Sequence, residues 1–191
     1  MEDTNMDKYV IIAVIAVVVL AVLVYVIKKR NKFVELKNRV EDQKAQIDVQ
    51  LKRRFDLIPN LVETVKGCAN FEKSTLEAVV SARANAVNAK DLSGAISANE
   101  NLTAALHRLI AVSESYPELK SNTSFVQLQG ELAATEDKIA KARQFFNDTV
   151  LKYNNAIQMF PANIVAGIFG YAKYDYLEVS EAERENVKVS F

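Results

Sequence analysis

The sequence predicts an all-α protein, in which an N-terminal transmembrane helix is followed by an elongated, antiparallel (up-and-down) four-helix bundle with long first and last helices. Three observations lead to this fold class. Residues 9–27 are apolar and contain no charged residue, Gly or Pro. After them, apolar residues recur at steps of three, four and seven, which is the spacing of one helix face. The whole chain of 191 residues has only five Gly and three Pro.

These features divide the chain into four parts. Residues 1–8 form a short N-terminal tail, residues 9–27 the transmembrane helix, and residues 28–179 the helical-bundle domain. Residues 180–191 are rich in charge, and we expect this C-terminal tail to be mobile. Without the anchor about 160 residues remain, which is the size of a single domain.

The apolar segment has the length and the flanks of a membrane anchor. About 19 residues at a rise of about 1.5 Å each give a helix of about 28 Å, close to the thickness of the hydrocarbon core. Lys28, Lys29 and Arg30 follow the segment, whereas acidic residues dominate before it. This predicts a single-pass protein of the cell membrane, with a short N-terminus outside and a cytoplasmic bundle. We expect the three cations, with Tyr9 and Tyr25, to anchor the helix at the membrane interfaces.

A cleaved signal peptide is the alternative interpretation of this segment. A signal peptide has a basic start, a shorter apolar run and a cleavage site with small residues. Here the start contains Glu2, Asp3 and Asp7, and the apolar run ends in Tyr25, Val26 and Ile27 before the lysines. The sequence therefore favours a retained anchor.

The first water-facing helix continues directly from the anchor. Its predicted buried face consists of Phe33, Leu36, Val40, Ile47, Leu51, Phe55, Ile58, Val62 and Val65. Pro59 lacks an N–H group and crowds the carbonyl of Phe55, so we expect a kink or a break there. Gly67 is the expected C-terminal stop of the helix.

Two helices follow. The second is predicted to begin between residues 70 and 74, where Ser74 and Glu77 have the spacing of a capping box. Its predicted apolar face consists of Leu76, Val79, Val80, Arg83 and Val87. The third helix follows a turn near residues 91–94 and ends before Pro117. Its predicted stripe consists of Ile96, Leu102, Leu106, Leu109 and Ile110.

The last long helix has the clearest pattern. It starts either with a capping box of Ser124 and Gln127 or with Asn122 as the cap, and it extends for about 36 residues. A row of large side chains consists of Phe125, Leu132, Ile139, Phe146, Tyr153 and Phe160, and the neighbouring row of Leu128, Thr135, Ala142, Thr149 and Ala156. Large rows beside small rows let a second helix approach closely.

Composition and residue spacing argue against several classes of function. The chain has 24 basic and 24 acidic residues, so it lacks the charge of a nucleic-acid-binding protein. A di-iron site in a helical bundle needs Glu-x-x-His pairs, but His107 is the only histidine and Ala104 stands three residues before it. Cys68 is the only cysteine. We therefore predict no enzyme, no metal site and no cofactor.

Two segments are candidates for a docking or assembly surface. Basic and polar residues surround Pro59, and aromatic residues follow Pro161. The predicted surface consists of Lys52, Arg53, Arg54, Asp56, Asn60, Phe169, Tyr171, Tyr174 and Tyr176. A structural alternative for the first group is that a polar side chain bonds the backbone groups at Pro59 while an arginine pairs with an acid of the bundle. The aromatic segment could instead cap the bundle or lie on the membrane surface.

Two long blocks of sequence resemble the LemA family. One is QIDVQLKRRFDLIPNLVETVKG at residues 46–67. The other contains YPELKSN at residues 116–122, FVQLQGELAATEDKIAKARQFFNDTVLKYNNAI at residues 125–157 and FPANIVAGIFGY at residues 160–171. This chain has Lys44 and Cys68 where the family often has aromatic residues. The resemblance implies a helical bundle on a single-span anchor, and it implies no reaction.

The sequence thus favours a non-enzymatic helical scaffold that is anchored in the lipid bilayer and forms homo-oligomers at the membrane. The alternative is a membrane-tethered adaptor that recruits another, unidentified protein through the bundle surface. A receptor is the weaker interpretation, because residues 1–8 are too few to form a ligand pocket outside the membrane.

Overall fold

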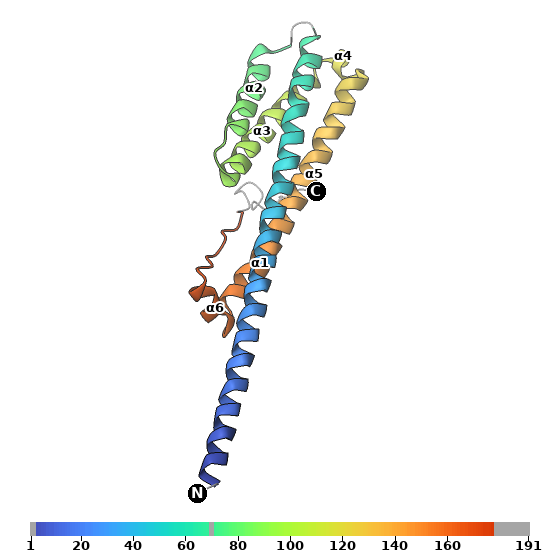
Figure 1. The fold of residues 1–191 in the computed structure, drawn as a ribbon. Coiled ribbons are helices and arrows are strands. Elements are labelled where there is room, and N and C mark those ends of the chain that lie inside the picture. The colour runs from blue at the N-terminus through green and yellow to red at the C-terminus, as the bar shows by residue number, and fades with distance from the viewer. Residues whose placement is uncertain (1–2, 69–70, 178–191) are drawn as a thin grey trace, which may run out of the picture. The chain divides into compact units, whose positions relative to one another are not determined.

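The computed structural model describes residues 3–68 and 71–177, with side chains from residue 8 onward, and all regular structure in these residues is helical (Figure 1). This confirms the predicted all-α class. The six helices are α1 (Asp3–Lys66), α2 (Lys73–Val87), α3 (Leu92–Ser113), α4 (Pro117–Lys120), α5 (Thr123–Gln158) and α6 (Ala162–Ile168). The antiparallel four-helix arrangement stays a prediction, and so does the tail at residues 180–191, which lies outside the described residues.

The chain forms two compact units, which we describe separately. The first unit comprises Met1–Glu41 and Asp148–Tyr176, and the second comprises Asp42–Asn147 and Leu177–Phe191. Helices α1 and α5 each contribute residues to both units. The first unit therefore contains the apolar part of α1 together with α6, and the second contains α2, α3 and α4.

Helix α1 contains both the apolar segment and a long core-forming face. All nine residues predicted for its buried face are buried, from Phe33 to Val65. Residues 9–24, in contrast, have exposed side chains. Helix α1 continues through Pro59 to Lys66, so the chain does not break there, and a kink at this proline stays a prediction. Gly67 follows directly, as predicted for the helix end.

Helices α2 and α3 differ in how well the sequence predicts their faces. The stripe of α3 is confirmed, with four of its five residues buried and Ile110 half-buried. In α2 the buried residues are Thr75, Val79 and Ala86, whereas Val80 and Val87 are exposed. The predicted capping box at Ser74 is wrong: Glu72 is the N-cap residue and makes no side-chain cap bond. The small residues of α2 let it pack closely on α3, which explains the different face.

Helix α5 confirms the alternation of large and small rows. The large residues from Phe125 to Tyr153 are buried, and the small row is buried or half-buried. Asn122, the alternative cap, accepts a hydrogen bond at Oδ1 from the backbone N–H of Phe125 at 3.1 Å. Phe160 departs from the pattern because α5 ends at Gln158, and its side chain is 80% exposed.

Helix α6 ends in a turn that requires glycine. Gly170 has φ +70°, a backbone conformation that residues with a Cβ atom rarely adopt. The N–H of Tyr171 donates to the carbonyl of Ala166 at 3.0 Å, which is the bond of a Schellman motif. After this turn the chain has no regular secondary structure, and we call residues 171–177 the C-terminal strap. Neither α6 nor the strap was predicted from the sequence as a separate element.

Candidate functional site

In the second unit, Arg54 forms a buried ion pair in place of the exposed docking contact that its sequence context suggested. The residue is only 3% exposed. Its guanidinium pairs with the carboxylate of Glu136 on α5 and donates to Oδ1 of Asn99 on α3 at 2.8 Å. Burial lowers the pKa of Arg54, and the Glu136 carboxylate opposes that shift. Arg54 therefore cannot belong to an exposed docking surface, and it has the partners that the structural alternative requires.

A second arginine bonds the backbone group that Pro59 leaves without a helical partner. In an uninterrupted helix, the carbonyl of Phe55 would accept from the N–H of residue 59, which a proline lacks. Nε of Arg83 on α2 donates to this carbonyl at 2.7 Å. Since a buried carbonyl without a donor is unfavourable, this bond explains how α1 continues through the proline.

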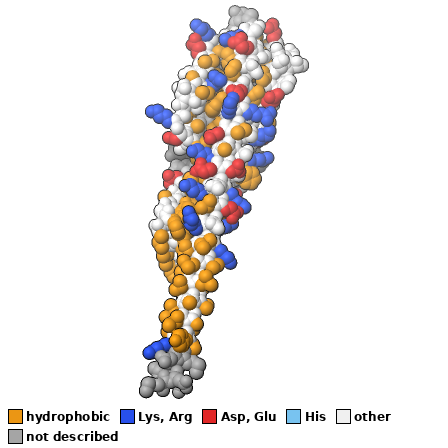
Figure 2. All heavy atoms as spheres, in the orientation of Figure 1, with side chains coloured by type: hydrophobic (Ala, Val, Ile, Leu, Met, Phe, Trp, Pro, Cys, Tyr) orange, Lys and Arg blue, Asp and Glu red, His pale blue; other side chains and the backbone are white. Residues whose placement is uncertain are grey.

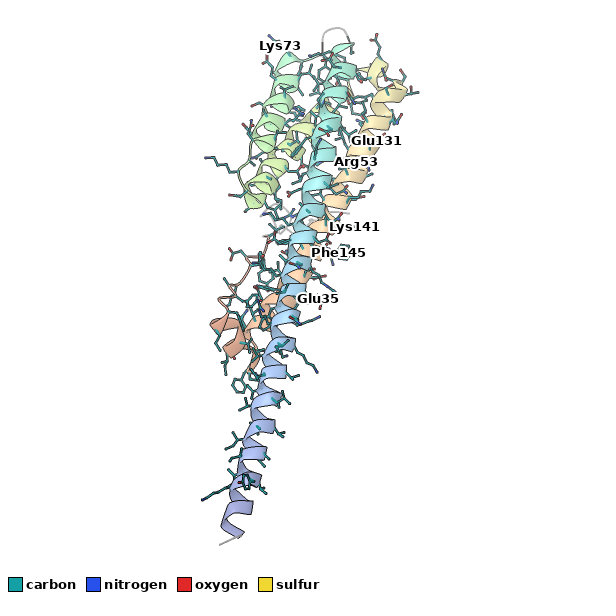
Figure 3. All side chains as sticks on the ribbon, in the orientation of Figure 1. Glu35, Arg53, Lys73, Glu131, Lys141 and Phe145 are labelled. Atoms are coloured by element: carbon teal, nitrogen blue, oxygen red, sulfur yellow. The ribbon has the colours of Figure 1, made fainter. Side chains whose placement is uncertain are left out.

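The other polar candidates around Pro59 are exposed. Lys52 and Asp56 form an ion pair with each other at 2.7 Å, one helical turn apart. Both residues also line a hollow of about 400 Å³ between α1, α2 and the start of α3. Arg53 projects from α1 (Figure 3), and Asn60 is also exposed. A docking role for these four residues stays a prediction.

The second unit also contains a larger apolar groove, of about 690 Å³, between the end of α1 and helix α2. Apolar side chains line it, and lysines and a glutamate lie among them. The lining consists of Val62, Lys66, Cys68, Phe71, Lys73, Leu76, Glu77, Val80, Ser81 and Ala84. Apolar walls with a few charged groups are typical of surfaces that accept an apolar ligand or a helix.

In the first unit, the C-terminal strap packs on α1 and α5. The ring of Tyr171 lies edge-on to the buried Phe33, with centroids 5.2 Å apart. The ring of Tyr174 lies edge-on to Tyr153 at 5.2 Å, and its hydroxyl donates to Glu41 at 2.5 Å. Tyr171 and Tyr174 are thus half-buried in contacts within one chain, whereas Phe169 and Tyr176 remain about half exposed. This arrangement fits the capping alternative for the first two residues.

An asparagine of α5 fixes the strap backbone. Asn154 is 4% exposed, and its side-chain amide donates to the carbonyl of Tyr174 at 2.9 Å and accepts from the N–H of Tyr174 at 3.1 Å. In the second unit, Asn147 makes the same pair of bonds to Leu177, both at 2.9 Å. Because a side-chain amide carries both donor N–H groups and an acceptor oxygen, each asparagine can bond the N–H and the carbonyl of one strap residue, as a neighbouring strand would.

We predict that the Tyr174 contact weakens at alkaline pH. Burial, followed by the hydrogen bond to Glu41, raises the pKa of Tyr174. The unfolded chain therefore ionises first, near pH ~10, and the stability that this residue contributes below that pH is lost as the pH rises through the folded-state pKa. Tyr174→Phe should make the free energy of unfolding fall less steeply above pH ~10, measured by guanidinium unfolding of the full chain in detergent.

Tyr176→Phe is the matched control, because its ring is 47% exposed. That variant should keep the slope of the native chain. Parallel curves for the native chain and Tyr174→Phe would contradict the assignment. Tyr153 also has a raised pKa, caused by burial and then by Tyr171, so part of the alkaline loss should remain in both variants.

The first unit presents a group of exposed apolar side chains where α5 ends and α6 follows. We call this group the α6 corner; it consists of Met159, Phe160, Ile164, Ile168 and Phe169. Figure 2 shows hydrophobic side chains over this part of the molecule and along the apolar part of α1. The cationic group of Arg30 lies 5.2 Å from the ring centroid of Phe169, and Lys29 lies 5.5 Å from that of Tyr25.

Several residues of these contacts were not predicted from the sequence, although the sequence pattern around some of them could have indicated their role. Arg83 is a charged residue within the apolar stripe predicted for α2. Asn147 and Asn154 are seven residues apart and lie beside buried aromatics of α5, a spacing that places both on one face. Glu136 carries no comparable signal, because it is one of four acidic residues on α5 and nothing in the sequence distinguishes it from the other three.

Comparisons with known proteins identify the family of the chain. Residues 43–191 match the LemA family. The magnetosome protein MamQ 2 of Paramagnetospirillum magneticum is 26% identical over 198 residues, covering 90% of this chain and 72% of the relative. Protein LemA of Metamycoplasma hominis is 24% identical over 163 residues, covering 85% of this chain and 74% of the relative.

The apolar helix and the family match both indicate a location at a membrane. Among the described residues, one helix is long and apolar enough to cross a membrane, and its apolar window is not covered by the rest of the chain. This fits a membrane-associated protein. Because the family match includes most of the sequence, from residue 43 to residue 191, the chain belongs to the LemA family.

Proposed function

We propose that this protein is a non-enzymatic helical scaffold, anchored in a membrane by α1, that assembles with copies of itself. The observation that carries the proposal is the dual character of α1. Its apolar segment at residues 9–24 is exposed in the single chain, whereas from Phe33 to Val65 the same helix supplies buried core residues. One continuous helix thus joins an exposed apolar segment, which suits lipid, to the core of the water-facing part.

The proposed orientation places the bundle in the cytoplasm. Lys28, Lys29 and Arg30 follow the apolar segment and favour the cytoplasmic side. A protease added to intact cells or right-side-out vesicles should leave residues 28–191 uncut, and it should degrade them only after the membrane is permeabilised. Digestion without permeabilisation would reverse the orientation.

Self-assembly is supported by an exposed aromatic ring on α5. Phe145 is 59% exposed and projects from the helix (Figure 3). Aromatic residues, phenylalanine among them, are enriched in protein interfaces relative to the rest of the protein surface. Anchoring all copies in one membrane raises their local concentration, so weak contacts can suffice for assembly.

Photo-crosslinking in cells tests the assembly. A benzophenone side chain in place of Phe145 should give adducts between two copies of this chain. His107 is the control position, because it is exposed on α3, and a probe there should give few self-adducts. Only monomers at Phe145, together with a monomeric mass in mild detergent, would contradict the scaffold.

The apolar groove beside α2 favours a second candidate function, that of an adaptor for another protein. Val80 lines this groove and is 49% exposed. A benzophenone at position 80 should then crosslink to one foreign protein in stoichiometric amount. Foreign adducts at position 80 without self-adducts at position 145 would favour the adaptor over the scaffold.

The charged side chains support a structural role more than a chemical one. Several acidic residues pair with lysines or arginines of their own helix, as Glu35 does with Lys32 at 3.0 Å and Arg39 at 2.7 Å. Such pairs are typical of solvated helix faces. Partial burial and Glu118 raise the pKa of the Cys68 thiol, which is opposite to the shift of a cysteine nucleophile.

A further inference from the structure

The α6 corner exposes more apolar surface than a short helical turn needs for its own packing. Helix α6 already buries Ala162, Val165 and Ala166 within the first unit. The opposite side presents Ile164 at 55% exposure and Ile168 at 72%. Met159 and Phe160, which connect α5 to α6, are 66% and 80% exposed. Contiguous apolar residues of this kind mark an interaction surface.

Two aromatic contacts fix the position of the α6 corner along the axis of α1. Phe169 lies against Arg30, and Tyr171 lies against Phe33. Arg30 is three residues beyond Ile27, the last residue of the apolar segment, which corresponds to about 4.5 Å along the helix axis. The headgroup region of each leaflet is about 5–8 Å thick. Phe169 therefore lies at the level of the lipid headgroups if the apolar segment fills the hydrocarbon core.

The charges around the corner also suit a lipid surface. A helix that lies in a membrane interface usually has basic residues on its polar side, and α6 itself has none. In this unit, α1 supplies them instead, with Lys28, Lys29, Arg30 and Lys32 next to the end of the apolar segment. The apolar side chains thus come from α6 and its flanking residues, and the cations come from α1 at the same level, so the sequence of the aromatic segment alone does not contain both features.

We propose that the α6 corner inserts into the interfacial region of the same bilayer that holds α1, as a second lipid contact of the chain. This inference rests on the proposed membrane anchoring. Its ligand is the headgroup and upper acyl region of a bilayer, with anionic headgroups next to the lysines. The continuity between the corner and the anchor favours lipid over a second copy of the chain, because lipid already surrounds α1 at that level.

The absence of tryptophan from the chain provides a clean probe. Ile168→Trp gives a single-tryptophan protein at an exposed position, so the fold should be retained, which circular dichroism checks. The full chain is reconstituted in vesicles of phosphatidylcholine and phosphatidylglycerol whose acyl chains are brominated either near the headgroup or near the chain end. Bromine quenches tryptophan only at short range. We expect the emission of Ile168→Trp to fall roughly twofold with bromine near the headgroup and to change less with bromine near the chain end.

Two matched variants calibrate the depth. Leu20→Trp lies inside the apolar segment and should be quenched most by bromine near the chain end. Tyr176→Trp is an aromatic exchange in the same unit, and its neighbour Tyr174 contacts Glu41, which is 14 residues beyond Ile27 and so about 21 Å further along α1. Tyr176→Trp should retain its emission in both lipids.

The outcomes separate this inference from the proposed anchoring. Quenching at Leu20 but none at Ile168 overturns the inference and leaves the anchor in place. No quenching at either position overturns the anchor itself. A blue-shifted Ile168→Trp emission without quenching shows that protein covers the corner, as a second copy would, and also overturns the inference.

Discussion

Glu136→Ala should lower the free energy of unfolding by about 3 kcal/mol, at the lower end of the ~3–5 kcal/mol typical for loss of one partner of a buried ion pair. The reason is the asymmetry of burial. The Arg54 side chain is 4% exposed, whereas the side chain of Glu136 is 41% exposed. Removing the carboxylate leaves a buried cation whose remaining hydrogen-bond partner is Asn99. Guanidinium unfolding of the full chain in detergent measures the effect.

The reverse substitution should be less harmful. Arg54→Met removes the buried charge, and the side chain of Glu136, which is 41% exposed, can turn toward solvent, so the main loss is the hydrogen bond to Asn99, at about 1–2 kcal/mol. The double variant should be no less stable than Arg54→Met. Arg53→Met and Asp137→Ala are matched controls, because both residues are exposed neighbours, and each should change stability by less than about 0.5 kcal/mol. An equal loss for Glu136→Ala and Asp137→Ala would show that the ion pair contributes nothing.

The helical periodicity of the sequence was sufficient to predict most of the core. The stripe of α1 and the large row of α5 are repetitive enough to fix which face of each helix is buried, and both faces are buried as predicted except at Phe160, which lies beyond the end of α5. Helix α2 was less predictable because its contact face consists of small residues such as Thr75 and Ala86, which provide little hydrophobic signal. The valines at positions 80 and 87 gave the stronger pattern, yet they line hollows in the surface.

The candidate sites were less predictable because they depend on contacts between distant residues. Sequence alone could suggest that one of two adjacent arginines pairs with an acid, but the choice of Arg54 follows from the phase of α1, which turns Arg53 to solvent. The position of the strap follows from a glycine turn and from asparagines about 20–30 residues earlier in the chain, as the bonds of Asn154 and Asn147 show. The spacing of residues along the sequence does not identify such long-range contacts unless both partners are residue types that are unusual at their positions in a helix.

Arg83→Met should lower the free energy of unfolding by about 1.5–3 kcal/mol, because it removes a charged donor from the carbonyl of the buried residue Phe55. The size of this loss should depend on Pro59. In a Pro59→Ala background, the new N–H of residue 59 can donate to the same carbonyl, which then no longer needs the guanidinium. Arg83→Met should therefore lose less than about half as much stability in that background, giving a coupling of roughly 1 kcal/mol in a double-mutant cycle.

The cycle distinguishes backbone repair from simple packing. If Arg83 acted only through its aliphatic stem or its charge, Met would lower stability equally in both backgrounds, and the coupling would be near zero. Arg108→Met on α3 is the matched control, since Arg108 is exposed and should show no coupling to Pro59. A coupling confined to position 83 would mean that the arginine of α2 replaces a main-chain donor, so that α1 can extend unbroken from its apolar segment to Lys66 despite an internal proline.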